Sequence, residues 1–425
     1  MKIKRYVTAA LLAAISVLSY SKTLTVSVRV DNPSGMAKAS EPVVVKLKDV
    51  KKLDFDVLSA TVKAGGRDVA SQLDDMDGDF VNDELFFLAD IGAGETVTYD
   101  VELSDEAVGT SAVPRVYTAF QLRDKKDLYP DVLKVEAPGS TNVFNDIYMH
   151  GITVESELAG YRIYFDERQN VDLYGKKKRR LELAETQFYT TAEQLAQGYG
   201  TDVLWAGKAI GCGSFKMVRN QQPSNWDCVK VRGQRVVTTG ALRTVVEVYD
   251  LGIPVSEVPG AVAKQGARFD VHQYYSLYAG HRDLQVDVQF SKNLKGGVFC
   301  TGVQKVGVTA DEKTRMGHKS KGVIRKNGIA ASWGCDYPDM GKKQLWAPEP
   351  IGLAVYVPKK YVEGSNEDDL NYVYFVSPDK SGQLHYWLSF CADKEEGGYH
   401  SSNEWFDSLD AWKDGVSQPV KVTVK

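Results

Sequence analysis

The densest group of carboxylates lies near residue 80. It reads Asp74-Asp75-Met76-Asp77-Gly78-Asp79 and continues to Asp83-Glu84. Four of these residues occupy positions 1, 3, 5 and 9 of a calcium-type loop, although Gly78 stands at position 4 and Phe86 at position 12, so the run is not an EF-hand. The spacing predicts a calcium site, or alternatively a solvated acidic turn with a nearby Lys or Arg. The predicted ligands are Asp75, Asp77, Asp79, Asp83 and Glu84.

A second group of reactive side chains runs from His150 to Lys176. Carboxylates accept hydrogen bonds from hydroxyl groups, and an arginine can hold a uronate carboxylate through two parallel hydrogen bonds. Strand alternation places Tyr161, Ile163 and Phe165 on one face and Arg162, Tyr164 and Asp166 on the other. If the first row faces the core, the second faces a cleft or solvent; the alternative is a polar outer strand with cross-strand salt bridges.

These residue types suit proton abstraction beside a carboxylate, which requires a base, an acid and a neutralising group. The candidates are His150 or His272 as base, Arg162 as neutraliser, and Tyr161, Tyr164 or Tyr189 as acid. A hydrolase would instead use two carboxylates, Glu155 or Glu157 with Asp172. We therefore predict His150, Arg162, Tyr164 and His272 as catalytic residues. The predicted substrate-binding residues are Glu155, Glu157, Tyr161, Asp172, Tyr174, Lys176, Tyr189 and Asp202.

The elements that must position these residues are mostly strands. Apolar and polar residues alternate in several segments, as in antiparallel sheets that bury one face. Helical patterns are confined to 191–197 and 402–413, so a parallel α/β sheet is not expected. The alternating segments are 24–30, 97–103, 284–290, 384–390 and 420–424.

The chain divides into three predicted parts. Lys2, Lys4 and Arg5 followed by an apolar run to Leu18 predict a signal peptide over 1–21. The polar segment 104–113 reads as a linker. It separates a small N-terminal β-sandwich, 22–113, from a large domain, 114–425, of two large antiparallel sheets packed face to face. The concave face of such a sandwich is a natural cleft for an oligosaccharide.

Composition limits which cellular compartment and which binding partners are expected. Removing the signal peptide lowers Lys plus Arg from 52 to 49 against 56 acidic residues, a net charge of 49 − 56 = −7. This balance argues against nucleic acid as a partner. We expect a periplasmic or secreted protein with no membrane anchor after signal removal, and with cysteines that are mainly buried and structural.

Two segments, His150 to Lys176 and Phe188 to Trp205, resemble the family named domain of unknown function 4861. The resemblance covers nearly the whole mature chain. It implies an exported bacterial protein encoded among polysaccharide-degradation functions, beside enzymes that act on uronate-containing glycans. It also implies that the large domain is similar to the galactose-mutarotase-like antiparallel supersandwich. The family offers no catalytic assignment to transfer, and fold similarity alone licenses none.

The function expected from residues and resemblance together is that of a carbohydrate-active protein. Its ligand or substrate would be a uronate-containing oligosaccharide, and its reaction that of a lyase or glycoside hydrolase. Two alternatives stay open: a non-catalytic glycan-binding module, and a scaffold or partner-binding protein. Calcium is the one predicted cofactor.

Overall fold

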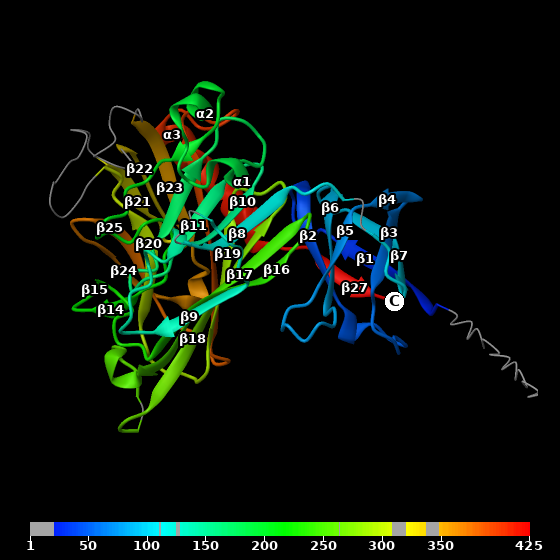
Figure 1. Cartoon of the computed structure of the whole chain (residues 1–425), viewed down its shortest axis with the longest axis horizontal. Coiled ribbons are helices and arrows are strands. Elements are labelled where there is room, and N and C mark those ends of the chain that lie inside the picture. Colours follow the sequence, from blue (N-terminus) through cyan, green and yellow to red (C-terminus); the bar gives the residue numbers. More distant parts are fainter. Residues whose placement is uncertain (1–20, 110–111, 125–127, 263, 308–319, 337–347) are drawn as a thin grey trace, which may run out of the picture.

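The computed structural model describes residues 21–109, 112–124, 128–262, 264–307, 320–336 and 348–425. The chain is mostly β, and all named strand pairs are antiparallel, which confirms the predicted fold class (Figure 1). The predicted signal peptide falls almost entirely outside the described residues. Within the described residues, no helix is long and apolar enough to cross a membrane.

The small domain is a sandwich of a five-stranded and a three-stranded sheet. Alternating residues such as Val28, Val30, Val43, Leu85 and Val101 meet between the sheets and are buried. The five-stranded sheet has the order β27 (Lys421–Val424), β1 (Thr23–Asp31), β7 (Thr96–Ser104), β3 (Ser59–Ala64), β4 (Arg67–Val69). The three-stranded sheet has the order β2 (Lys38–Lys46), β6 (Glu84–Ile91), β5 (Ser71–Asp74).

The last strand corrects the predicted domain boundary. The prediction assigned every residue from 114 to 425 to the large domain, but β27 pairs with β1 in the small domain, with Val28 opposite Val424 and Val30 opposite Val422. In Figure 1 this red strand lies among the blue ones. Its alternation is visible in the sequence, but the partner of a strand depends on the path of the chain.

The large domain is a sandwich of one wide sheet against two narrower ones. Its core takes residues from all three sheets, among them Tyr161, Val271, Tyr275 and Val303. The nine-stranded sheet has the order β21 (Lys321–Ile324), β22 (Ile329–Asp336), β23 (Glu349–Tyr356), β26 (Gln383–Ala392), β19 (Leu284–Phe290), β18 (Arg268–Tyr278), β17 (Arg243–Pro254), β16 (Val231–Thr239), β9 (Lys134–Pro138).

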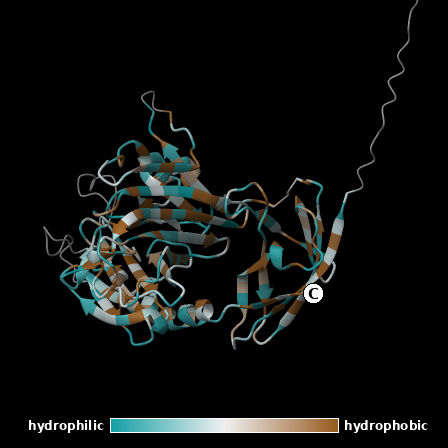
Figure 2. Cartoon of the chain, turned by 90° about the horizontal axis from the view of Figure 1, so that it is seen from below, coloured by the Kyte–Doolittle hydropathy of each residue, from teal (hydrophilic) through white to brown (hydrophobic). Residues whose placement is uncertain are grey.

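The opposing layer consists of a five-stranded and a three-stranded sheet. The first has the order β13 (Thr201–Asp202), β12 (Val171–Gly175), β11 (Gly160–Tyr164), β10 (Ile147–Ser156), β8 (Val116–Leu122). The second has the order β20 (Phe299–Gln304), β25 (Asn371–Val376), β24 (Val362–Glu367). The hairpin of β14 (Met217–Arg219) and β15 (Gln222–Ser224) lies between them in sequence. Bands of brown and teal alternate along many of these strands in Figure 2, as expected when one face is buried.

The helices are short, apart from one. They are α1 (Leu183–Thr186), α2 (Ala192–Ala196), α3 (Ser402–Ser417) and the 3-10 turns η1 (Leu47–Asp49), η2 (Val255–Glu257) and η4 (Lys359–Tyr361). Both predicted helices are present as α2 and α3. Helix α3 is capped by the Ser401 hydroxyl, which accepts a hydrogen bond from the Glu404 backbone N–H. Its buried Trp405 and Leu409 pack on the outer side of β22 and β23.

A buried arginine joins the two domains. Arg243 of the large domain pairs with Asp74, and its Nη1 lies 2.9 Å from Glu84, so it binds both stems of the acidic loop. Phe86 stacks on Tyr278 across the same boundary with ring centroids 5.6 Å apart. The two domains therefore share a polar contact and a small apolar core.

Candidate functional site

The candidate site is built around a bulge in β10. The pairing of β10 with β8 shifts between Tyr148 and Thr153, and Met149 and His150 have φ values of 59° and 62°. Left-handed backbone is unfavourable for residues with a Cβ, and such strain and bulges concentrate at functional sites. The bulge sets His150 parallel to Phe144, with ring centroids 4.1 Å apart.

His150 has a defined tautomer. Its Nδ1 lies 2.9 Å from the Phe144 carbonyl oxygen. Because a carbonyl only accepts hydrogen bonds, Nδ1 carries the proton, and in the neutral ring Nε2 carries the lone pair. Burial lowers the pKa of His150, and the charges of Arg162, Arg123 and Arg168 lower it further. His150 is therefore a neutral proton acceptor at pH 7.

Arg162 is held by three side chains on the outer face of the five-stranded sheet. Its Nη2 donates to Tyr164 Oη at 2.9 Å and to Asp202 Oδ2 at 3.1 Å, and it also pairs with Asp172. Tyr164 donates to the same Asp172 oxygen at 2.8 Å. Asp172 faces Arg162 because the two residues are opposite each other in the pairing of β11 with β12.

Part of the Arg162 guanidinium has no acceptor. The residue is 3% exposed and lies between the rings of Tyr164 and Phe188, 4.8 and 4.4 Å from their centroids. Among the described residues, nothing accepts a hydrogen bond from its Nε or Nη1, and the buried Tyr189 hydroxyl also has no partner. An unpaired buried polar group costs roughly 1–3 kcal/mol. The cluster therefore holds buried N–H donors that lack a protein acceptor in the described part of the chain.

The environment of Asp202 beside Arg162 disfavours its charged form. Burial raises the pKa of Asp202 well above its usual range, and repulsion from Asp172 raises it further. Arg162 and the Leu204 backbone N–H oppose this shift without cancelling it. The shift favours the neutral form of Asp202.

Tyrosines line the adjoining surface. Tyr129 stacks on Tyr148 with centroids 3.7 Å apart, and Tyr148 meets Tyr189 edge-on at 5.9 Å. Burial raises the pKa of Tyr148 to about 12, so its hydroxyl stays protonated. Aromatic rings beside donors and a carboxyl pair form a surface suited to a sugar ring.

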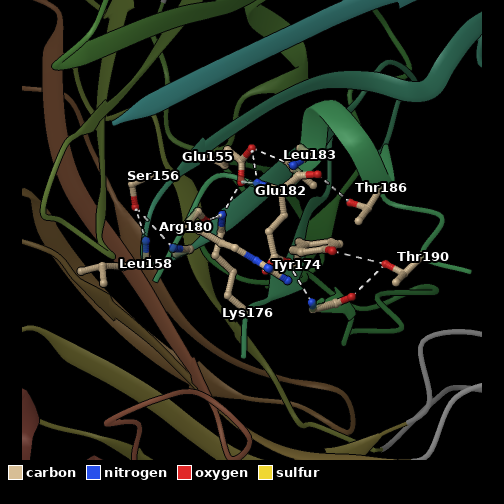
Figure 3. A network of polar contacts seen from close by, with 12 residues as sticks. Glu155, Ser156, Leu158, Tyr174, Lys176, Arg180, Glu182, Leu183, Thr186 and Thr190 are labelled. Carbon is tan, nitrogen blue, oxygen red and sulfur yellow. Dashed lines mark hydrogen bonds and ion pairs between the residues drawn. The ribbon is translucent and has the colours of Figure 1, made fainter. Parts of the chain in front are cut away.

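A buried ion-pair network holds the segment that covers this face (Figure 3). Glu155 pairs with Lys176 and accepts hydrogen bonds from the backbone N–H groups of Glu182 and Leu183. Lys176 also donates to the Arg180 carbonyl at 2.7 Å, and Glu182 accepts from Gly200 N at 2.8 Å. The network fixes α1 and the residues after it, including Phe188 and Tyr189, over Arg162.

The predicted residues therefore separate into groups. His150, Arg162, Tyr164, Asp172, Tyr189 and Asp202 come together. Glu155 and Lys176 are buried in the network, and Tyr174 is buried with its hydroxyl 3.3 Å from Thr190 Oγ1. Glu157 pairs with Arg115 near the domain boundary. Tyr161 lies in the core and donates to the Arg282 carbonyl, because its strand face is the inner one.

His272 does not belong to this group. Its neighbours Val271 and Tyr275 point into the core, so His272 lies on the outer face of the nine-stranded sheet. Arg162 lies on the outer face of the opposite layer, because Tyr161 and Ile163 fill the inner one. The core separates the two residues, so of the two alternative bases, His150 and His272, only His150 lies on the same face as Arg162.

The acidic loop gathers three of its five predicted ligands. Carboxylate oxygens of Asp75, Asp77 and Asp83 lie within 4.8 Å of one another. Slight burial raises the pKa of Asp75, but hydrogen bonds from the Gly78 and Phe80 backbone N–H groups lower it more. Glu84 instead pairs with Arg243, and Asp79 accepts from the Val81 N–H at 2.8 Å. These three carboxylates, with oxygens that hard cations prefer, fit calcium.

Sequence reasoning missed Phe144, Tyr148 and Phe188. Phe188 and Tyr189 are adjacent in the sequence, but only their placement over β11 brings them to Arg162. The bulge at Met149 and His150 was not predicted, because positive φ is uncommon for residues other than glycine, even though histidine adopts it more often than most.

Comparison with known proteins assigns the chain to a family and finds solved structures that are distantly similar to it. A family model described as domain of unknown function (DUF4861) matches residues 30–422. No curated protein is significantly similar to the chain. Two solved structures from Enterococcus faecalis are each 8% identical over 94% of the chain. One is a protein in glycosyl hydrolase family 38, with a TM-score of 0.48, and the other an alpha-mannosidase, with a TM-score of 0.45. The chain spans about half of their length, 47% and 46%.

Proposed function

The chain belongs to the family described as domain of unknown function (DUF4861), and from this premise we propose that it is an exported carbohydrate-active protein. It acts on uronate-containing oligosaccharides in polysaccharide degradation, in the periplasm or outside the cell. The observation that carries the proposal is a neutral His150 on left-handed backbone, close enough to the buried Arg162 to feel its charge, while Nε and Nη1 of Arg162 have no acceptor among the described residues.

The chemistry that this group supports best is β-elimination. Arg162 would bind the uronate carboxylate through its unpaired N–H groups. His150 Nε2 would accept the C5 proton, and the C5–H electron pair would form the C4–C5 double bond as the C4–O bond breaks. The Tyr189 hydroxyl would donate its proton to the departing oxygen. Proton exchange with water then restores His150 and Tyr189.

Product analysis tests the proposal. The protein is incubated with a panel of uronate-containing oligosaccharides, with and without calcium, and the fragments are followed by mass spectrometry and ultraviolet absorbance. A fragment lighter by one water than its hydrolytic counterpart, absorbing as a 4,5-unsaturated uronate, is expected. Binding without any product would favour a glycan-binding module. A stable protein complex without sugar binding would favour a scaffold.

Calcium is part of the same proposal. The three clustered carboxylates support it, because Asp75, Asp77 and Asp83 can each give one oxygen to one ion. The loop is attached to the large domain through Asp74 and Glu84, so the ion would stabilise the loop rather than take part in elimination at Arg162.

A further inference from the structure

The outer face of the nine-stranded sheet carries a row of polar groups that the proposed elimination does not use. Glu247 on β17, Tyr274 on β18, Asp287 on β19 and His385 on β26 are opposite one another in consecutive strand pairs. Helix α3 packs on one part of this face, and the small domain contacts it at Tyr278.

His272 lies beside this row and is oriented by a carboxylate. Its Nδ1 is 2.6 Å from Glu247 Oε1, and Arg235 pairs with the other oxygen of Glu247. An ionised carboxylate only accepts hydrogen bonds, so Nδ1 carries the proton and Nε2 carries the lone pair in the neutral ring. The side chain of His272 is 33% exposed, so water can reach the ring.

Asp287 has the opposite character to Glu247. Burial raises the pKa of Asp287, while the Gln285 amide, 2.7 Å from Oδ2, opposes the shift. Burial also acts to raise the pKa of Glu247, but the bonds from His272 and Arg235 lower it overall. The two carboxyl groups therefore suit different roles: Glu247 favours the charged form that holds His272 Nδ1–H, and Asp287 favours the protonated form that can donate a proton.

The strand register sets the separation of the two groups. Glu247 and Asp287 are two strands apart, which is about 9.5 Å between backbones at the usual strand spacing. His272 pairs with Gln289, so Asp287 is its diagonal neighbour at about 7–8 Å. In inverting glycosidases the two carboxyl groups lie about 6.5–9.5 Å apart, which leaves room for a water molecule, and the backbone spacings on this face are of similar size.

We propose that this face is a second site, at which a glycoside is hydrolysed with inversion by His272 as base and Asp287 as acid. The proposal goes beyond elimination at Arg162 and uses none of its residues. His272 Nε2 accepts a proton from water as the water oxygen bonds to the anomeric carbon. The bond from that carbon to the leaving oxygen breaks, and this oxygen takes the Asp287 proton. Glu247 is a positioning residue, and proton exchange with solvent resets the pair.

The test uses the full chain and aryl glycosides. A panel of 4-nitrophenyl and 2,4-dinitrophenyl glycosides, including glycosiduronic acids, is assayed for phenol release, and proton NMR identifies the anomer formed first. We expect hydrolysis with inverted configuration. H272Q should lower kcat about 100-fold. E247Q should lower kcat with KM unchanged. H400Q is the matched control: His400 also pairs with a carboxylate, Asp393, at 3.1 Å, but it is not part of the proposed site. This substitution should therefore have no effect.

Asp287 has its own internal control. D287N should lower kcat about 100-fold on glycosides with poor leaving groups but keep most activity on 2,4-dinitrophenyl glycosides, whose leaving group needs no proton. Retention of that activity also shows that the variant is folded. Retained anomeric configuration, equal loss on both leaving groups, or no hydrolysis of any glycoside would overturn the inference. Elimination is read separately as ultraviolet absorbance, so either proposal can fail alone.

Discussion

Residue-scale chemistry in this protein depends on how neighbours set the charge of single groups. His150 is kept neutral by burial and by nearby arginines, and its Nδ1–H is engaged by the Phe144 carbonyl. Asp202 is held towards its neutral form by burial and by the neighbouring Asp172. Both shifts arise from groups that β10, β11, β12 and β13 bring together.

Replacing His150 tests the proposed base. We expect H150Q to lower the rate of elimination about 100-fold without a comparable loss of thermal stability. In the wild type, the rate should fall as the pH drops through the pKa of His150, and this fall should occur below the usual histidine range because that pKa is lowered. The measurement is a pH–rate profile of unsaturated product. An unchanged rate in H150Q would contradict the assignment.

Replacing Asp202 tests its raised pKa through stability. A carboxyl group whose folded-state pKa is raised binds its proton more tightly in the folded state, so stability falls as the pH rises from about 4, the unfolded value, towards the folded pKa. D202N cannot ionise and should therefore gain stability relative to the wild type over this range. Urea unfolding at several pH values measures the difference, and a pH-independent difference would refute the prediction.

At the scale of elements, the site depends on a segment that has little regular structure of its own. The residues from 176 to 200 contain only the short helices α1 and α2, yet Glu155 on β10 binds two of their backbone N–H groups and Lys176. This buried network replaces the regular hydrogen bonds that the segment lacks. Its loss should release Phe188 and Tyr189 from Arg162.

The network makes a quantitative prediction. K176M leaves the Glu155 carboxylate buried without its cation and should lower the free energy of unfolding by about 3–5 kcal/mol. The double variant with E155M should recover part of the loss, because both charges are then absent. K177M is the matched control and should have a small effect, since the Lys177 ammonium makes a long contact, 3.5 Å, with the Leu195 carbonyl and no ion pair within 4 Å among the described residues. Urea unfolding compares the four proteins.

The acidic loop is tested by removing metal. If the loop binds calcium, excess chelator should lower Tm and added calcium should restore it, because an ion that binds only the folded state stabilises that state. D77N should remove most of this response, since Asp77 belongs to the cluster. D68N is the control outside it. An unchanged Tm in chelator, with no metal by elemental analysis, would exclude the site.

At the scale of the whole molecule, the two domains are not consecutive units of the chain. The small domain needs β27 from the far end of the sequence, and Arg243 binds its acidic loop from the large domain. All five cysteines lie in the described part of the chain as free thiols, so these contacts rather than disulfides join the distant segments.

Removing β27 tests this arrangement. Deletion of residues 421–425 exposes the edge of β1 and should lower the stability of the small domain, seen as an earlier or separate transition in calorimetry. V424T is a milder control that keeps the backbone pairing with Val28. A single unchanged transition after the deletion would show that β27 contributes little.

The sequence by itself determined the class of the fold. Strict alternation at Val26, Val28 and Val30, and at Leu284, Val286 and Val288, specifies strands with one buried face, because side chains on a strand point alternately to opposite sides. The same rule correctly placed Tyr161 and Ile163 on one face of their strand and Arg162 and Tyr164 on the other face. Strand formation and the face on which a side chain lies are local properties, so the alternation of apolar and polar residues within one segment is enough to predict them.

Which residues meet depends on the tertiary structure. The sequence offered His150 and His272 as alternative bases for Arg162, and the core lies between His272 and Arg162; it also left Glu247 and Asp287 unnoticed on strands 40 residues apart. Partners across a sheet depend on strand order and register, which arise from how the whole chain packs. The left-handed backbone at His150 has the same origin, since tertiary contacts must stabilise a conformation that the residue does not favour.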